Sequence, residues 1–315
     1  MSRTWGITQA IDLAEAHERM TATMSIPLPP VPKEKRPRPV QVRAKVVGVR
    51  VVGAYREFTL HAPGVGVDAQ PGQFITLGVG GNSSALLLRR AFALSGVDGD
   101  TINVVVATHG PGTRWICDRQ LGDVLDLIGP LGRPFPAPPP GGAALLVAGG
   151  YGAASFVGLA QRLCAAGHAV AAVLGAATGD RLYAVPEFRA LTRVLAVTTE
   201  DGSAGRTGRV TDVVPELLPG ASVVYACGPM PMLRAVAAQS AAYGLICHVS
   251  VEEAMACGIG VCMTCVLPVI GDDGTSRFLR SCVDGPVFEG ANVRFDDIGR
   301  LPDDLYGAAA MRATR

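Results

Sequence analysis

Apolar and polar residues alternate in short runs after residue 40. The alternation predicts strands over residues 41–52, 55–61, 72–79, 86–95, 101–107 and 123–128. Turn signals such as Pro71-Gly72 separate these runs, and no long helical pattern lies between them. Closely spaced strands of this kind predict a small antiparallel β-barrel over residues 40–137.

From residue 141 the pattern changes to buried apolar runs that alternate with amphipathic segments. We expect strands over residues 145–148, 170–175, 194–199, 223–227 and 247–251, and helices over residues 155–166, 185–192, 211–218 and 231–243. This order predicts an α/β domain over residues 141–250, with a parallel sheet and helices on both faces. The chain is then expected to leave the sheet and form a small third domain, residues 251–299, with strands over 265–270 and 275–282.

The two ends of the chain carry a different texture. Prolines alternate with lysine and arginine between residues 27 and 39, which predicts a flexible N-terminal extension over residues 1–39, with a short helix over residues 11–20. Residues 300–315 are expected to form a C-terminal tail. The uncharged stretch 135–161 is long enough to span a bilayer, but prolines and glycines interrupt it, so we interpret it as part of a soluble domain.

Composition narrows the classes of function. A formal net charge of +1 gives no surplus that points to nucleic acid or to an anionic membrane. Eight cysteines without a signal peptide argue against a secreted disulfide framework and favour a reducing cytoplasm. The five histidines are dispersed, and no Ser/His/Asp arrangement is visible. We therefore expect no catalytic acid or base in this chain.

Four cysteines carry the most specific signal. Cys257, Cys262 and Cys265 are spaced C-x4-C-x2-C, and Cys282 follows after sixteen residues. Three thiolates on one glycine-containing loop with a distant fourth are typical of the plant-type [2Fe–2S] site. A structural zinc site and buried unliganded cysteines are the alternatives, but structural zinc more often uses two short C-x2-C knuckles. The spacing favours an iron–sulfur cluster.

Two weaker signals lie in the predicted barrel. Arg90-Ala91-Phe92-Ala93 places a cation beside an aromatic ring, which can pair with a diphosphate and cover a flat heterocycle. Gly110-Pro111-Gly112-Thr113 can open a helix and present backbone N–H groups to phosphate. Each alone could be a rim arginine or an ordinary hairpin. Together, in a barrel that precedes an α/β domain, they favour a flavin.

A further pair of motifs lies at the ends of predicted parallel strands. Gly149-Gly150-Tyr151-Gly152 follows the first strand, and Cys227-Gly228 ends a later one. Nucleotides bind outside the carboxyl ends of such strands, although the G-x-G-x-x-G fingerprint is absent and a plain tight turn is the alternative. No arginine pair is visible for a 2′-phosphate, and Glu200-Asp201 would repel one, so NAD is favoured over NADP.

These blocks, in this order, resemble the ferredoxin–NADP reductase superfamily, and within it the electron-transfer subunits of NAD-dependent, heteromeric dihydroorotate dehydrogenase. The resemblance covers residues 40–298 and is most specific over 252–265 and 282–288, with support from 129–135, 147–152 and 225–230. It implies FAD in the barrel, NAD(H) on the parallel sheet and a [2Fe–2S] cluster in the C-terminal loop. It also implies an FMN-containing catalytic subunit as partner, in a heterotetramer with two copies of each subunit. Electrons are then expected to pass from FMN through the cluster and FAD to NAD⁺ in pyrimidine biosynthesis.

Residues are carried over from the resemblance by position. It makes four residues the cluster ligands: Cys257, Cys262, Cys265 and Cys282. It makes nine residues the lining of the FAD site: Arg90, Ala91, Phe92, Ala93, Val105, Val106, Ala107, Gly112 and Thr113. It makes five residues face the nicotinamide nucleotide: Gly149, Gly150, Gly152, Cys227 and Gly228.

The chain departs from the family pattern at three positions. Ala91 stands where the family usually has proline. Ala93 stands where the family usually has serine, and the lost hydroxyl is expected to weaken or retune FAD binding by about 0.5–1.5 kcal/mol. Ser155 replaces a proline that is common after the glycine turn, a change expected to be tolerated. Two other functions stay open: the same relay could serve a different oxidoreductase, or the fold could be a non-catalytic iron–sulfur redox sensor.

Overall fold

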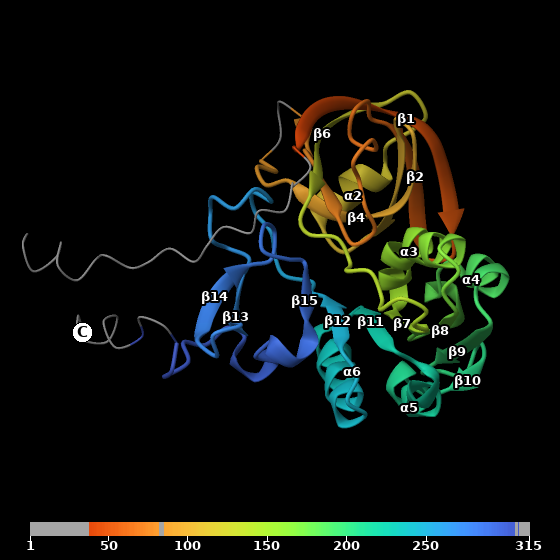
Figure 1. The fold of residues 1–315 in the computed structure, drawn as a ribbon. Coiled ribbons are helices and arrows are strands. Elements are labelled where there is room, and N and C mark those ends of the chain that lie inside the picture. The colour runs from red at the N-terminus through yellow and green to blue at the C-terminus, as the bar shows by residue number, and fades with distance from the viewer. Residues whose placement is uncertain (1–37, 82–84, 306–307, 309–315) are drawn as a thin grey trace, which may run out of the picture. The chain divides into compact units, whose positions relative to one another are not determined.

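The computed structural model describes residues 38–81, 85–305 and residue 308 (Figure 1). Residues 40–131 form a closed barrel of antiparallel strands in the order β1-β2-β5-β4-β3-β6. These strands are β1 (Val40–Val52), β2 (Tyr55–His61), β3 (Phe74–Leu77), β4 (Arg90–Asp98), β5 (Thr101–Ala107) and β6 (Val124–Leu131). A short helix, α2 (Pro111–Cys117), follows β5. The predicted barrel is confirmed.

The period of two along each strand decides which side chains fill the barrel. Ile102, Val104 and Val106 of β5 are buried in the barrel core with Phe58 of β2. Val105, which lies between them, points out of the barrel and packs in the apolar cluster of the neighbouring α/β domain. The outer side of β5 therefore faces the parallel sheet, and this orientation matters for the site below.

The second part of the chain forms a seven-stranded sheet in the order β10-β9-β8-β7-β11-β12-β15. Its strands are β7 (Ala144–Gly149), β8 (Val170–Ala176), β9 (Val194–Thr199), β10 (Arg206–Thr207), β11 (Val223–Cys227), β12 (Cys247–Ser250) and β15 (Val287–Glu289). All neighbours are parallel except β15, which pairs antiparallel with β12. The helices are α3 (Ala154–Ala165), α4 (Val185–Leu191), α5 (Val210–Leu217) and α6 (Met230–Ala242).

Successive residues of β7 pack on opposite faces of this sheet. Leu146 lies in one cluster with Phe156 of α3 and Phe188 of α4. Leu145 lies in another cluster with residues of α5 and α6, among them Leu233. Burial on both faces explains why these strands read as continuous apolar runs. The predicted parallel sheet with helices on both faces is confirmed.

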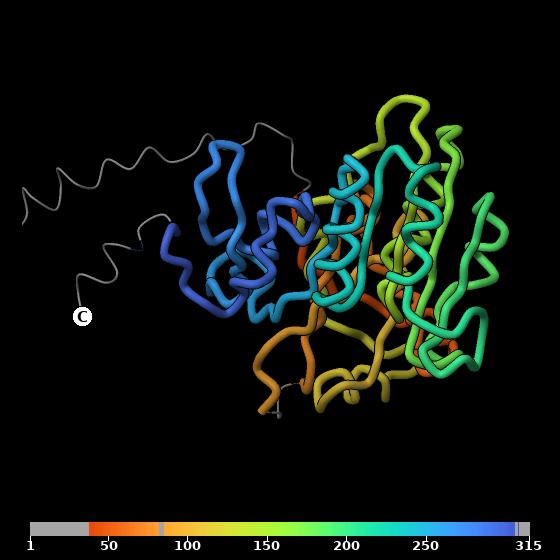
Figure 2. Tube along the Cα trace, turned by 90° about the horizontal axis from the view of Figure 1, so that it is seen from below, coloured from red at the N-terminus to blue at the C-terminus, as the bar shows by residue number. Residues whose placement is uncertain are grey.

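After β12 the chain leaves the sheet, as predicted, and forms the cysteine loop and a hairpin. The hairpin consists of β13 (Val266–Ile270) and β14 (Ser276–Arg280), and it lies at the β15 end of the sheet in both views (Figures 1 and 2). The chain then returns to the sheet through β15. The sequence pattern did not predict this return or the two-residue strand β10, because both are too short to show a period.

The predicted strand that differs most in its bounds lies in the barrel. The apolar run 86–95 predicts a strand, but β4 begins at Arg90 and continues to Asp98. Leu87 and Leu88 are 88% and 54% exposed, so they extend the apolar run without forming part of the barrel wall. The predicted N-terminal extension lies outside the described residues except for positions 38 and 39. Within the described part of the chain, every helix is too short or too polar to cross a bilayer.

Candidate functional site

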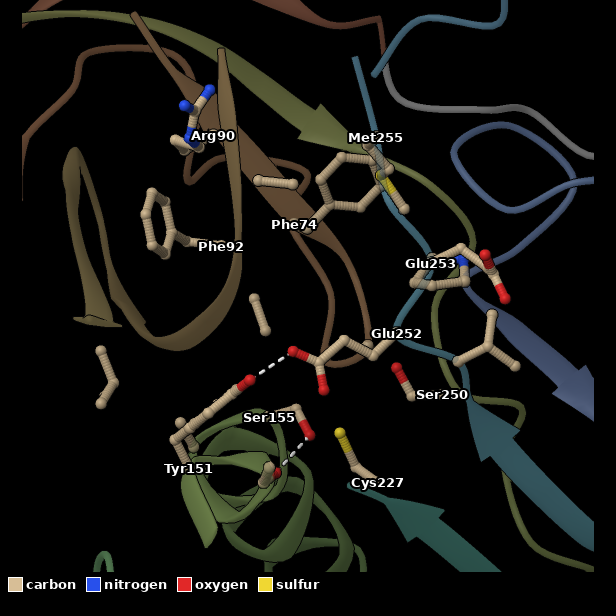
Figure 3. A pocket seen from close by; sticks show the side chains of 18 of the residues that line it. Phe74, Arg90, Phe92, Tyr151, Ser155, Cys227, Ser250, Glu252, Glu253 and Met255 are labelled. Atoms are coloured by element: carbon tan, nitrogen blue, oxygen red, sulfur yellow. Dashed lines mark hydrogen bonds between the residues drawn. The ribbon is translucent and has the colours of Figure 1, made fainter. Parts of the chain in front are cut away.

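The first cavity, of about 520 Å³, lies between the barrel and the parallel sheet. On the barrel side it is lined by Phe74 of β3, by residues 89–93 and by Val105 of β5. On the sheet side it is lined by the start of α3, the end of β11 and the segment 250–255 that follows β12 (Figure 3). Five of the nine predicted flavin residues meet here: Arg90, Ala91, Phe92, Ala93 and Val105.

The two adjacent arginines of this cavity are held differently. Arg89 is fixed to the barrel wall, because it pairs with Asp126 at 2.7 Å and donates to Thr76 Oγ1 at 3.1 Å. Arg90 takes part in no ion pair within the described part of the chain, and its Nη1 donates to the carbonyl oxygen of Leu88 at 2.6 Å. Arg90 is thus the cation that the cavity offers to an anionic group such as a diphosphate.

The remaining four predicted flavin residues lie outside the cavity lining. Val106 fills the barrel core, and Ala107 packs against the apolar cluster of the α/β domain. Gly112 approaches Arg90 so closely that an added Cβ would lie 2.5 Å from the guanidinium Nε. Thr113 Oγ1 accepts hydrogen bonds from the backbone N–H groups of residues 109 and 110, so it closes the turn before α2. The turn before α2 therefore packs closely against the Arg90 side chain.

The second cavity, of about 580 Å³, lies at the C-terminal ends of β7, β8 and β9 and the N-terminal ends of α5 and α6. The predicted nucleotide residues divide between the two cavities. Gly149 and Gly150 line the second cavity. Gly152, Cys227 and Gly228 line the first. Taken together, the turn at residues 149–152 and the turn at Cys227-Gly228 thus border both cavities.

Charged residues gather at one side of the second cavity. Arg181, Glu200 and Arg209 all line it, and Arg209 Nε lies 3.6 Å from Glu200 Oε2. The sequence showed no arginine pair for a 2′-phosphate, whereas Arg181 and Arg209 both line this cavity, because the turn after β9 brings Arg209 back to Glu200. Asp201 does not line the cavity; its carboxylate accepts a hydrogen bond from Ser203 Oγ at 2.6 Å.

Polar groups line the sheet side of the first cavity. Burial raises the pKa of Cys227 to about 11, so its thiol stays protonated at neutral pH. Ser155 Oγ donates to the carbonyl oxygen of Gly152 at 2.8 Å, and the hydroxyls of Ser155 and Ser250 both interact with Cys227. Burial also raises the pKa of Glu253. Sequence reasoning missed Ser250 as a lining residue, because nothing in its local pattern distinguishes it from other strand-end serines.

The backbone of the cysteine loop has the conformation that its glycines lead us to expect. Gly258 and Gly260 have φ values of +73° and +84°, which other residues rarely adopt. These turns aim backbone N–H groups of Ile259 and Val261 at Cys257 Sγ, each at a distance of 3.4 Å. Such a loop can hold a thiolate by hydrogen bonds from its own backbone.

The four cysteines of this loop and hairpin fall into two pairs. The side chain of Cys262 interacts with Cys257, and that of Cys282 interacts with Cys265. The second pair is set by the hairpin, since Ser281 N donates to the carbonyl oxygen of Cys265 at 2.9 Å. Within the described residues no three His, Cys, Asp or Glu side chains converge on a single point, as one metal ion would require. Cys282 also interacts electrostatically with Cys257, so the two pairs lie near each other.

An apolar contact joins the second pair to the first cavity. Cys265 and Cys282 are both 2% exposed and form one cluster with Phe74 and Leu131, against which Met255 packs. Phe74 and Met255 also line the first cavity, and Figure 3 shows them together at one side of it. The cavity and the buried cysteines are thus separated by side chains and not by solvent.

Comparisons with known proteins agree with this geometry. Residues 252–294 match the iron–sulfur cluster binding domain of dihydroorotate dehydrogenase B, and residues 146–238 match the oxidoreductase NAD-binding domain. A solved structure of an NADH-dependent reduced ferredoxin–NADP oxidoreductase superposes with a TM-score of 0.72 at 29% identity, covering 87% of this chain and 99% of that one. The FAD/NAD-binding domain of a nitric oxide dioxygenase from Vibrio cholerae, at 22% identity and a TM-score of 0.60, shares the fold.

Relatives at the level of sequence are more specific. The electron transfer subunit of dihydroorotate dehydrogenase B (NAD(+)) from Geobacillus thermodenitrificans is 38% identical over 257 residues, which is 80% of this chain and 97% of the relative. A probable subunit of the same kind from Methanopyrus kandleri is 38% identical over 240 residues, 76% of this chain and 86% of that one. The resemblance seen in the motifs is confirmed, and the chain belongs to the family of electron transfer subunits of NAD-dependent dihydroorotate dehydrogenase B.

Proposed function

We propose that this chain holds FAD in the first cavity, binds NAD(H) in the second and carries a [2Fe–2S] cluster on Cys257, Cys262, Cys265 and Cys282. With these groups it passes electrons between an FMN-containing catalytic subunit and NAD⁺ in pyrimidine biosynthesis. A flavin exchanges hydride with a nicotinamide and single electrons with an iron–sulfur cluster, so it belongs between the two. The assembly we propose is a cytoplasmic heterotetramer with two copies of each subunit.

The observation that carries the proposal is the position of the first cavity between the other two sites. Tyr151 and Glu252 line both cavities, so the two spaces share a wall. On its other side, Phe74 and Met255 separate the first cavity from the buried cysteines. A ligand in the first cavity would therefore border both the nucleotide and the cluster, as a relay requires.

The cysteine geometry supports a two-iron cluster over zinc. A [2Fe–2S] cluster takes four cysteine thiolates, two on each iron. The pairs Cys257–Cys262 and Cys265–Cys282 fit that need, and three cysteines on one loop with a distant fourth differ from the two short knuckles common in structural zinc sites. The backbone N–H groups at Cys257 would stabilise the negative charge of the cluster sulfurs.

The first cavity fits a flavin in charge and in shape. Arg90 would pair with the diphosphate, and Phe92 would cover part of the FAD beside it. Ala93 offers no hydroxyl, but Ser155 and Ser250 line the same cavity from the sheet side and carry hydroxyls toward it. These hydroxyls and the neutral thiol of Cys227 would offer hydrogen bonds that the family serine supplies elsewhere.

The second cavity fits NAD(H) better than NADP(H). Glu200 follows β9 at the sheet edge, where an acidic residue can accept hydrogen bonds from the adenosine ribose hydroxyls. Arg209 Nε lies 3.6 Å from Glu200 Oε2, so Glu200 competes with a 2′-phosphate for this arginine. We therefore assign Glu200 the role of favouring NAD.

The exposed tip of the cysteine loop supports a partner at that edge. Ile259, Val261 and Met263 are 47%, 74% and 52% exposed, although all three are apolar. Exposed apolar side chains that gather in one place are typical of interaction surfaces. Electrons must leave or enter the cluster at this edge, so we assign the tip to the catalytic subunit.

The proposal is tested on the full chain, purified without oxygen. Iron and flavin are quantified, and the visible spectrum is recorded before and after addition of NADH. Flavin bands and cluster absorption that both bleach are the expected result, and orotate formation with NAD⁺ is expected once an FMN catalytic subunit is added. Cys282→Ser should remove the cluster absorption, whereas Cys164→Ser, outside the loop, should retain it. Cluster absorption without flavin would overturn the relay and favour the redox-sensor function.

A further inference from the structure

Two side chains from distant parts of the chain form the wall that the two cavities share. Tyr151 belongs to the glycine turn after β7, and Glu252 follows β12. Their side chains point toward each other, and the Tyr151 hydroxyl donates a hydrogen bond to Glu252 Oε1 (Figure 3). Among the described residues, these two alone line both cavities.

Two aromatic side chains pack against the Tyr151 ring. Its centroid lies 6.0 Å from that of Tyr55 and 5.8 Å from that of His109, and both contacts are edge-on. Glu252, by contrast, is exposed and pairs with no cation among the described residues. The hydrogen bond from the Tyr151 hydroxyl is therefore the contact that holds the Glu252 carboxylate in the shared wall.

Hydride transfer requires the nicotinamide ring to touch the flavin ring. The two cavities meet at Tyr151 and Glu252, so a dinucleotide seated in the second cavity brings its nicotinamide toward the first at this pair. The adenosine and diphosphate parts have no such need, because they lie within the second cavity.

We propose that Tyr151 and Glu252 form a gate that is closed by their hydrogen bond and that the nicotinamide ring must open. This inference rests on the proposed function, since it takes the first cavity as the flavin site and the second as the nucleotide site. A closed gate lowers the apparent affinity for a dinucleotide by the fraction of molecules in which the gate is open. The gate thus keeps the flavin edge covered until a nicotinamide arrives.

The test compares two ligands that differ by the nicotinamide ring. Calorimetric dissociation constants for NAD⁺ and ADP-ribose are measured on the full chain with its bound groups, for the wild type and for Tyr151→Phe. The phenylalanine keeps the ring packing and removes the hydrogen bond. We expect NAD⁺ to bind roughly 10-fold more tightly to Tyr151→Phe, because a hydrogen bond to a charged group holds the gate closed by at least that factor. ADP-ribose affinity should stay unchanged.

A second variant and a matched control complete the experiment. Glu252→Gln retains a weaker, neutral hydrogen bond, so its gain in NAD⁺ affinity should be smaller than that of Tyr151→Phe. Tyr183→Phe breaks another tyrosine–glutamate hydrogen bond, to Glu57 at 2.5 Å, in which neither residue lines either of these two cavities, and it should leave the NAD⁺ to ADP-ribose ratio unchanged.

Two results would overturn the gate and leave the proposed function intact. The first is an unchanged ratio of the two affinities in Tyr151→Phe. The second is weaker NAD⁺ binding at constant ADP-ribose affinity, which would make the hydroxyl a positioning group for the nicotinamide. If the wild type bound neither ligand, the nucleotide site itself would be wrong, and the gate with it.

Discussion

Phe74 is the side chain whose removal tests most directly how the first cavity and the cysteines are connected. It is 4% exposed, lines the cavity and packs against Cys265, Cys282 and Leu131. Phe74→Ala would open the wall between the cavity and the buried cysteine pair. Water and oxygen would then reach the proposed cluster from the cavity side, so we expect the cluster to be lost faster in air.

The cost in stability can be estimated separately. Phe→Ala in a core costs about 3–5 kcal/mol, and we expect about 3 kcal/mol here because one face of the ring already borders a cavity. A loss of that size lowers the melting temperature of a domain of this size by about 6–12 °C. The assay is a thermal unfolding curve together with the decay of cluster absorbance in air at a temperature well below unfolding.

A matched variant separates stability from shielding. Phe188 of α4 is 0% exposed and packs in the α/β domain away from the cysteines. Phe188→Ala should lower the melting temperature at least as much, yet leave the cluster decay at the wild-type rate. The reasoning is refuted if Phe74→Ala and Phe188→Ala lose the cluster equally fast, because general destabilisation would then explain the effect.

Three further changes test the other assignments. Glu200→Ala should raise affinity for NADPH relative to NADH by about tenfold in a binding titration, because Arg209 could then form a charged hydrogen bond with the 2′-phosphate, worth about 1.5–3 kcal/mol. Glu216→Ala, outside the cavity, should not change the ratio, and an unchanged preference in Glu200→Ala would remove Glu200 from nucleotide selection. Val261→Asp should weaken association with the catalytic subunit in sedimentation, whereas Val67→Asp, equally exposed at 74% but on the barrel, should not; equal effects would place the partner elsewhere. Ala93→Ser should tighten FAD binding by about 2- to 10-fold in a fluorescence titration, since it restores a hydroxyl worth about 0.5–1.5 kcal/mol, and no gain would show that the serines of the sheet side already fill that role.

Local pattern predicted most of the fold because burial on one or both faces leaves a regular period. The strands 55–61, 101–107, 194–199 and 223–227 have the bounds that the pattern predicted. Strand β4 was displaced because Leu87 and Leu88 are apolar and exposed, a combination that no period reveals. β15 has three residues and takes its place from pairing with β12, so only long-range contacts specify it.

The candidate site was predictable where one short motif contains it and not where distant residues meet. The cysteine spacing and the arginine–aromatic pair at Arg90 are local, and the sequence predicted both as parts of a site. Tyr151 and Glu252 are 101 residues apart in the sequence, and the residues around each of them do not predict that the two side chains meet. The position of Arg209 beside Glu200 was not predicted either, because it depends on how the turn after β9 folds back.

The segment from Glu252 to Cys257 explains how this chain keeps its three sites together. Glu252 lines both cavities, residues 253–255 line the first cavity, and Cys257 begins the cysteine loop. Five extended residues span at most about 17 Å, so the nucleotide wall and the first proposed cluster ligand are tied within that distance by the backbone itself. Met255 packs inward against the cysteine cluster, which holds the segment on the barrel. A residue inserted between Glu252 and Met255 would move either the gate or the cysteine loop. The cavity-lining residues of the barrel and of the sheet would stay in place. The spacing of this segment, more than any single contact, therefore couples the three sites.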